Sequence, residues 1–162
     1  MTRPLSLRID IRLDDLQAII DLHGTTYAKE CGWNASFKAY VAGPLIDWFK
    51  NTSPRNRFWI AEENAKLVGC VAIVAVTSDI AQLRYLLVAP EFRGRGLGKR
   101  LFAEAVGFAK VQGYAKIILW TEQSLKAAAR LYAAAGFVKT EEKAGWKWGA
   151  HVVEEKHELA IL

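Results

Sequence analysis

Three glycines at alternate positions, bordered by basic residues, form the stretch of this chain with the clearest chemical capacity. The stretch reads Arg93-Gly94-Arg95-Gly96-Leu97-Gly98-Lys99-Arg100. An apolar strand pattern over 83–88 precedes it, and a helical pattern begins at Leu97. Backbone N–H groups and the positive end of a helix dipole would therefore converge on one spot. That arrangement predicts a binding site for phosphate or pyrophosphate.

Three other interpretations of the glycines fail on their context. An arginine–glycine tail that binds nucleic acid would lack the strand before and the helix after. A Rossmann-type dinucleotide loop has Gly-x-Gly-x-x-Gly and an acidic residue about 20 residues further on. Here the spacing is Gly-x-Gly-x-Gly, and Leu119-Trp120-Thr121 stands where the acid should be. A Walker loop needs Gly-Lys-Ser/Thr, which is absent.

The elements that must position this loop alternate between strands and helices. The predicted strands cover 5–11, 58–62, 67–76 with a bulge at Gly69, 80–88, 115–120, 137–142, and 152–162 with a break at 154–156. The predicted helices cover 15–28 capped by Asp14, 36–50 capped by Ser36 and bent at Pro44, 96–112, and 125–135, with Gly32 ending the first and an aromatic loop over 145–149.

Short turns between 58 and 88 predict an antiparallel meander, and the helical crossover to 115–120 predicts a parallel pair. The order indicates one α/β domain over residues 1–162. We expect a mixed, mostly antiparallel sheet of about seven strands, with about four helices distributed over both faces.

The composition limits the function classes. The chain has 162 residues, 52% of them hydrophobic, and a net charge of +5. No apolar run reaches the roughly 18 residues of a membrane span, and Met1–Ser6 has no signal-peptide core, so we expect a cytoplasmic protein. Cys31 and Cys70 lack metal-ligand spacing, which predicts reduced thiols and no metal site. No nucleic-acid-binding pattern is visible, and a polyanionic cofactor accounts for the densest basic cluster.

Three motifs occur in order along the chain. Arg93-Gly94-Arg95-Gly96-Leu97-Gly98 matches (Gln/Arg)-x-x-Gly-x-(Gly/Ala), Leu83-x-x-Leu86-x-Val88-x-Pro90 precedes it, and Tyr132-x-x-x-Gly136-Phe137 follows. Together they resemble the GCN5-related N-acetyltransferase (GNAT) superfamily over nearly the whole chain. Within it, the chain looks most like the acetyltransferase domains often fused to MarR-type regulators. We expect either a stand-alone domain or part of a longer protein.

The resemblance implies acetyl-CoA as cofactor and a splay between strands 80–88 and 115–120, where its pantetheine arm enters. The loop amides would hold the pyrophosphate. The Val88 amide would stabilise the charge that develops on the thioester oxygen. Tyr132, with an ordinary pKa of ~10, would be the acid for the leaving thiolate, or would only pack and anchor its helix. The residues expected at the cofactor are Leu86, Leu87, Val88, Arg93, Gly94, Arg95, Gly96, Leu97, Gly98, Lys99, Thr121 and Tyr132.

Two positions depart from relatives. Gln82 stands where histone-type members carry a glutamate base, and glutamine cannot accept the proton. Leu125 stands where many relatives have an asparagine that holds the pantetheine arm, a contact for which Thr121 or Ser124 is a substitute. The remaining candidates for the base are Glu30, His23, Glu62, Glu122 and His151. Geometry must choose among them.

By the same analogy, the acceptor pocket lies across the sheet from the cofactor. Its expected lining is Tyr27, Trp33, Phe37, Trp146 and Trp148. Such an aromatic pocket suits a cation or an apolar body. Trp33 and Trp48 fit a buried core and a homodimer interface equally well, because aromatic residues dominate both.

Three functions follow from this interpretation. The leading one is an N-acetyltransferase that transfers acetyl from acetyl-CoA to a primary amine of a small molecule or peptide, by direct attack in a ternary complex. The second is a toxin-like acetyltransferase of aminoacyl-tRNA, which requires a basic surface that continues onto the acceptor side. The third is a non-catalytic acyl-CoA-binding or interaction module, suggested by Gln82 and opposed by Tyr132.

Overall fold

The structure is a computed structural model that describes residues 4–162, so the first three residues of the predicted domain lie outside the described residues. The helices in this range are α1 (Leu13–Cys31), α2 (Ser36–Lys50), the short 3-10 helix η1 (Pro90–Phe92), α3 (Leu97–Val111) and α4 (Lys126–Ala134). The strands are β1 (Ser6–Arg8), β2 (Arg57–Glu63), β3 (Lys66–Ala75), β4 (Ile80–Val88), β5 (Lys116–Glu122), β6 (Val138–Lys147) and β7 (Ala150–Ala160).

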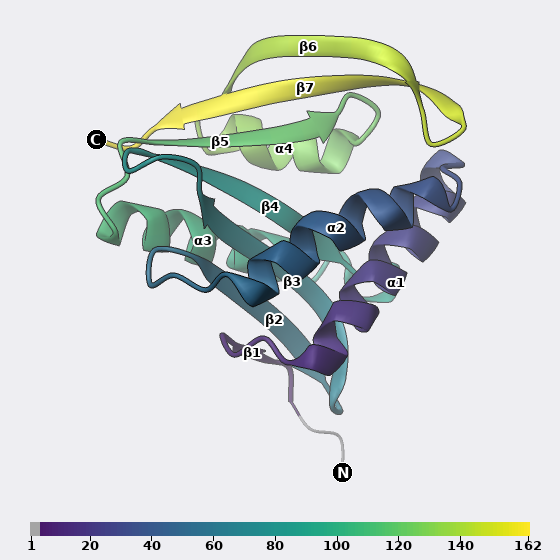
Figure 1. Ribbon diagram of the computed structural model, residues 1–162, viewed down its shortest axis with the longest axis horizontal. Helices are drawn as coiled ribbons and strands as arrows, with labels where there is room; N and C mark the ends of the chain where they lie inside the picture. Colours follow the sequence, from purple (N-terminus) through teal and green to yellow (C-terminus); the bar gives the residue numbers. More distant parts are fainter. Residues whose placement is uncertain (1–3) are drawn as a thin grey trace.

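The described strands form one seven-stranded sheet in the order β1-β2-β3-β4-β5-β7-β6. All neighbours are antiparallel except β4 and β5, which run parallel through the α3 crossover. Helices α1 and α2 cover one face of the sheet, and α3 and α4 cover the other (Figure 1). The predicted mixed sheet, its meander and its parallel pair are therefore confirmed.

Strands β4 and β5 pair only where they begin. Residues 80–82 pair with residues 116–118, and the last pair joins Gln82 to Ile118. Beyond this point the two strands diverge, as Figure 1 shows. The rest of β5 continues to pair with β7 as far as Glu122. The predicted splay is present, and it leaves the β5-facing edge of β4 without a strand partner from Leu83 onward.

A bulge in β4 lies directly beside this splay. Cys70 of β3 faces Leu87, whereas Ala72 faces Arg84, so β4 contains one extra residue. Tyr85 takes up the extra length with a φ of 60°, a left-handed conformation that is unusual for a bulky side chain. A bulge of this kind bends a strand and changes the direction of its side chains. The pattern of the sequence does not predict it.

The start of α1 is built by a carboxylate rather than by the predicted Asp14 cap. The Asp15 carboxylate accepts a hydrogen bond from the backbone N–H of Arg12 at 2.7 Å. The Arg8 guanidinium donates to both oxygens of the same carboxylate, at 2.9 and 2.6 Å. This network draws the chain out of β1 after three residues, so the predicted strand over 5–11 is too long. Ser36 is likewise not a cap, because its own backbone N–H donates to the Asn34 side chain.

The C-terminal hairpin is longer than predicted. β6 runs through the expected aromatic loop to Lys147, and β7 has no break at 154–156. The loop is the two-residue turn Trp148-Gly149, in which both residues have positive φ values of 54° and 74°. Such turns match the twist of the flanking strands. The charges at 154–156 pair across the hairpin with residues 141–143, which keeps them in the ladder.

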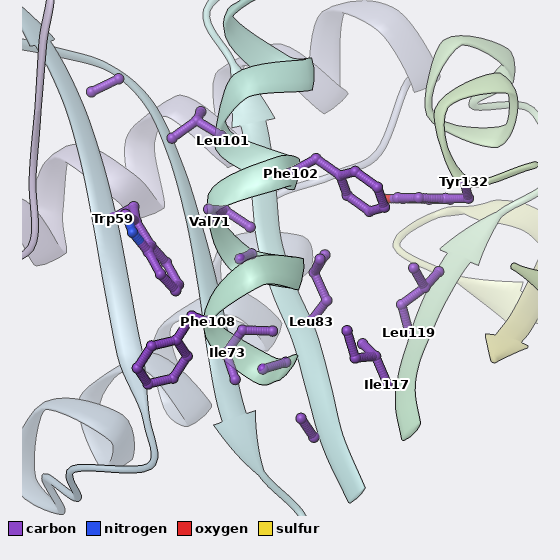
Figure 2. Packing of buried hydrophobic residues seen from close by; sticks show 14 of the residues in the cluster. Trp59, Val71, Ile73, Leu83, Leu101, Phe102, Phe108, Ile117, Leu119 and Tyr132 are labelled. Carbon is purple, nitrogen blue, oxygen red and sulfur yellow. The ribbon is translucent and has the colours of Figure 1, made fainter. Parts of the chain in front are cut away.

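The main core lies between the sheet and the α3/α4 face. Phe108 of α3 packs edge-on against Trp59 of β2, with ring centroids 5.4 Å apart. Nearer the splay, Phe102 of α3 points toward Tyr132 of α4 (Figure 2), at a centroid distance of 5.8 Å. The core therefore holds α4 and its tyrosine in a fixed place beside β4 and β5. No helix within residues 4–162 is long and apolar enough to cross a bilayer.

Candidate active site

The glycine loop opens directly into α3. Gly94 and Gly96 both have a φ of 78°, and Gly96 is the residue that precedes the first helical turn. No side chain in the described part of the chain caps this 15-residue helix, so the N–H groups of its first turn lack protein partners. The start of α1 differs, because a carboxylate occupies it. Free donors at the positive end of a helix are the local structure that binds phosphate.

The basic residues of the glycine loop differ in whether they are paired with a carboxylate. Arg93 forms an ion pair with Glu30 of α1, and its Nε donates to the Val88 carbonyl oxygen at 3.3 Å. Among the described residues, Arg95 and Lys99 have no carboxylate partner. Positive charge therefore surrounds the start of α3, but one of its guanidinium groups is already engaged.

The end of β4 presents its backbone to the splay. The Ala89 N–H donates to the Val68 carbonyl oxygen of β3 at 2.8 Å. Because N–H directions alternate along an antiparallel strand, the Val88 N–H points away from β3, toward the side that β5 has left. The α3 start adjoins it: a Cβ added at Gly98 would lie 3.6 Å from Val88 Cγ2. The loop and this strand end are therefore neighbours.

A cavity of about 160 Å³ occupies the splay and extends beneath α1 and α2. The predicted cofactor residues Leu86, Thr121 and Tyr132 line it, as do the predicted acceptor residues Tyr27, Trp33 and Trp148. Gln82 and Leu125, the two departures from relatives, line it as well. The structure thus brings one group from each predicted set into a single space between β4, β5 and three helices.

Tyr132 is buried at the edge of the cavity, among aromatic rings. Its ring packs against Phe102 and Phe137, with centroids 5.8 and 5.9 Å away. Within the described residues its hydroxyl makes no hydrogen bond, and the residue lines the cavity. Burial raises the pKa of its phenol above the usual value, so the group stays protonated at neutral pH.

The side of the cavity beneath α1 and α2 is a wall of aromatic rings. Trp33 stands 4.6 Å from Trp148 and 5.1 Å from Tyr27, measured between ring centroids. The wall is assembled where the α1–α2 corner meets the β6–β7 turn, because the Asn34 N–H donates to the Trp148 carbonyl oxygen at 2.8 Å. Trp146, which the sequence placed in this pocket, does not line the cavity. It lies on β6 with 75% of its surface exposed.

Among the five candidate bases, His23 and Glu122 reach the cavity. His23 Nδ1 lies 2.8 Å from the Ile19 carbonyl oxygen, so this nitrogen carries the proton and Nε2 keeps its lone pair. Burial lowers the pKa of His23 to about 4. The Glu122 carboxylate accepts the backbone N–H groups of Ser124 and Val153, at 2.9 and 3.1 Å.

The other three candidates lie elsewhere. Glu30 pairs with Arg93, Glu62 pairs with Arg8 near the start of α1, and His151 is exposed on β7. The remaining predicted cofactor residues, Leu87, Val88 and the loop from Arg93 to Lys99, lie at the end of β4 and the start of α3 rather than in the cavity lining.

Sequence reasoning missed Arg84 and Tyr85, which line the cavity from β4. Tyr85 enters because the bulge turns it toward His23, whose ring is 6.1 Å away in an edge-on arrangement. Arg84 could have been predicted from the sequence, because it follows Gln82 by two residues and alternation along a strand places both on the same face. Burial raises the pKa of Tyr85 to about 12.

The fold is a seven-stranded mixed sheet with a splayed parallel pair, and a glycine loop lies at the start of its crossover helix. The model of the Acetyltransferase (GNAT) family matches residues 16–137, three quarters of the chain. The protein therefore belongs to the GNAT acetyltransferase family.

Individual relatives agree with this assignment. The uncharacterized N-acetyltransferase MJ1207 of Methanocaldococcus jannaschii is 34% identical over 85% of this chain and 62% of its own length. YjgM of Escherichia coli, also an uncharacterized N-acetyltransferase, is 33% identical over 68% of this chain and 69% of its own. N-acetyltransferase family 8 member 3 of Rattus norvegicus is 37% identical over 52% of this chain. The match covers only 40% of that protein's own length.

A solved structure shares the whole fold. The protein yncA from Salmonella typhimurium, determined with its cofactor acetyl-CoA, superposes with a TM-score of 0.78 at 17% identity, covering 99% of this chain and 95% of that one. The ribosomal-protein-S18-alanine N-acetyltransferase from Escherichia coli gives a TM-score of 0.72 at 20% identity, covering 98% and 94%. At these identities the likeness shows the common fold.

Proposed function

We propose that this protein is an acetyl-CoA-dependent N-acetyltransferase of a primary amine on a small molecule or peptide. The observation that carries the proposal is the splay itself: an uncapped helix start and an unpaired strand edge lie at one end, and an unpartnered tyrosine hydroxyl lies inside. Family membership and the acetyl-CoA of yncA support the choice of cofactor.

The residues present fit acetyl-CoA. The amides of Gly96, Leu97 and Gly98 would hold its pyrophosphate, with Arg95 and Lys99 adding charge. The β4 edge from Leu86 to Val88 would pair with the pantetheine arm in place of the missing strand. Bound acetyl-CoA supplies an acetyl group already activated as a thioester. Leu125 and Thr121 offer the arm an apolar contact and a hydroxyl on the β5 side.

Two groups of this chain then act on the transfer. The Val88 N–H, directed into the splay, donates a hydrogen bond to the oxygen where negative charge develops, a contribution typically worth about 3–4 kcal/mol of barrier. The Tyr132 phenol is held protonated by burial and donates to the departing sulfur. Its neighbours Phe102 and Phe137 exclude water from that proton transfer.

The amine must reach the site without its proton. Gln82 cannot take a proton, the Glu122 carboxylate is already bound by backbone donors, and His23 has a pKa of about 4. We therefore assign deprotonation to solvent before binding, with the Nε2 lone pair of His23 accepting a hydrogen bond from the neutral amine. It follows that kcat/KM rises about tenfold per pH unit below the pKa of the acceptor amine.

Calorimetric titration with acetyl-CoA, and in parallel with coenzyme A, tests the proposal. We expect both to bind, with affinity that falls as salt is added because phosphates carry the recognition. Thiol release in the presence of amines should then exceed the release without amine. Binding without amine-dependent release would indicate the non-catalytic acyl-CoA module, and absence of binding would contradict the whole assignment.

A further inference from the structure

The charged side chains that line the cavity differ in whether the protein supplies them with hydrogen bonds or ion pairs. Glu122 accepts two backbone hydrogen bonds and one from the Ser124 hydroxyl. Glu154 forms an ion pair with Lys147 at 2.6 Å. Of the charged residues that line the cavity within the described chain, Arg84 alone has neither an ion pair nor a hydrogen bond. The acidic groups are therefore already engaged by the protein, whereas the guanidinium is not.

Arg84 lies on β4 beside the point where the splay begins. It follows Gln82, the last β4 residue paired with β5, and it precedes the bulge at Tyr85. Its guanidinium carbon lies over the Tyr85 ring, 5.0 Å from the centroid. A guanidinium packed on an aromatic face keeps its planar edge of N–H donors available, and that edge matches a carboxylate with two parallel hydrogen bonds.

The aromatic wall supplies the second half of the site. Trp33, Phe37 and Trp148 pack with centroid separations of 4.6 to 4.9 Å, and Tyr40 continues the wall 5.1 Å from Trp148. Flat rings of this kind favour an apolar or aromatic body. The cavity thus combines one unpaired cationic group with a large apolar surface.

We propose that the acceptor is a free α-amino acid with a bulky apolar or aromatic side chain, whose carboxylate is bound by Arg84. This rests on the proposed acetyl transfer and names its substrate class. The α-amine and the carboxylate share one carbon, so anchoring the carboxylate on β4 holds the amine beside the splay. The side chain lies against the aromatic wall. The N-terminus of a peptide lacks that adjacent carboxylate and is excluded.

Acceptor triads provide the test. Phenylalanine, tryptophan and leucine are each compared with the amine that lacks the carboxylate and with the primary amide, by thiol release at saturating acetyl-CoA. We expect kcat/KM for the acid, calculated per neutral amine, to exceed both analogues by about 10- to 100-fold, the effect of one charge-assisted interaction. The amine is more basic than the amino acid and the amide is less basic, so basicity alone cannot favour the acid over both.

Variants of Arg84 test whether this residue causes the preference for the acid. Arg84→Gln should abolish it, and Arg84→Lys should restore part of it. Arg57→Gln is the matched control, because Arg57 lies 4.5 Å over the Phe108 ring in the same way but outside the cavity; it should keep the full preference. Direct calorimetric binding of phenylalanine to the coenzyme A complex gives a readout independent of turnover and should be lost in Arg84→Gln.

Each outcome decides the question. Equal kcat/KM per neutral amine for acid and amide, or a preference that survives Arg84→Gln, overturns the inference. Acetyl-CoA binding without turnover of any acid in the triads also overturns it, while leaving the cofactor assignment intact. Failure of acetyl-CoA to bind is a failure of the proposed function itself, and the calorimetric titration separates that result from the others.

Discussion

Arg93 of the glycine loop and Glu30 of α1 form an ion pair across 63 residues of sequence. The same guanidinium donates to the Val88 carbonyl oxygen. One side chain therefore ties together the end of α1, the end of β4 and the loop expected to hold phosphate. If Arg93 is to contact the pyrophosphate, as the resemblance implies, it must leave Glu30.

Glu30→Gln should consequently tighten acetyl-CoA binding by a few fold, since it frees Arg93 and removes a negative charge near the phosphates. The folding cost should stay under about 1 kcal/mol, because both groups are partly exposed. Calorimetry at low salt measures the change. Glu104→Gln removes an exposed carboxylate on α3 and is the control. Weaker binding in Glu30→Gln alone would mean that the pair holds the loop in its binding conformation.

Gly96→Ala should destabilise the fold by about 1–2 kcal/mol, because Gly96 has a φ of 78° and a Cβ strains that conformation. Gly98→Ala is matched to it: Gly98 is helical, and its added Cβ would meet only Val88 Cγ2 at an ordinary 3.6 Å. We expect Gly98→Ala to fold as stably as the parent. Thermal unfolding compares the two, and equal losses of stability would count against the assigned helix start.

Tyr132→Phe should lower kcat at least tenfold while leaving acetyl-CoA affinity nearly unchanged. Its stability should not fall, since the lost hydroxyl has no partner among the described residues. Tyr114→Phe is the control, because that hydroxyl donates to the Arg55 carbonyl oxygen at 2.9 Å, away from the cavity. Single-turnover thiol release separates chemistry from binding. An unaltered rate in Tyr132→Phe would leave the ring only a packing role.

His23 should make the protein sensitive to mild acid. Its pKa is about 4 when folded and about 6.5 when unfolded, so the unfolded state binds more protons between these values. Its contribution is fully present above about pH 6.5 and is lost as the pH falls toward 4, by up to about 3 kcal/mol. Urea unfolding at several pH values should show a flatter profile for His23→Asn. A slope in His23→Asn that equals the parent's would refute this origin.

The sequence predicted the elements that local patterns determine. The apolar run of β4, the period of α3 and the stop at Gly32 have their boundaries within a residue or two of the structure. The parallel pairing followed from the helical crossover. The splay and the loop's role came from the family resemblance, because neither composition nor periodicity describes where two strands part.

Long-range contacts account for what the sequence did not predict. Trp146 and Trp148 look alike as residues, but the two-residue turn sends Trp148 onto the aromatic wall and leaves Trp146 facing solvent. The bulge that aims Tyr85 at His23 depends on the register of β3, which no local signal specifies. Arg84 is distinguished by the fact that Glu122 and Glu154 have partners elsewhere in the protein, a long-range property that no local pattern encodes.

In the described sheet, the first four strands are joined to the last three only by the pairing of β4 residues 80–82 with β5 residues 116–118. Strands β5, β7 and β6 are therefore connected to the rest of the sheet only through this short pairing and can hinge about it. A molecule bound in the splay contacts both parts of the sheet, so its binding free energy also opposes their separation. Amide hydrogens of β5, β7 and β6 should therefore exchange more slowly, as a group, when a ligand occupies the splay.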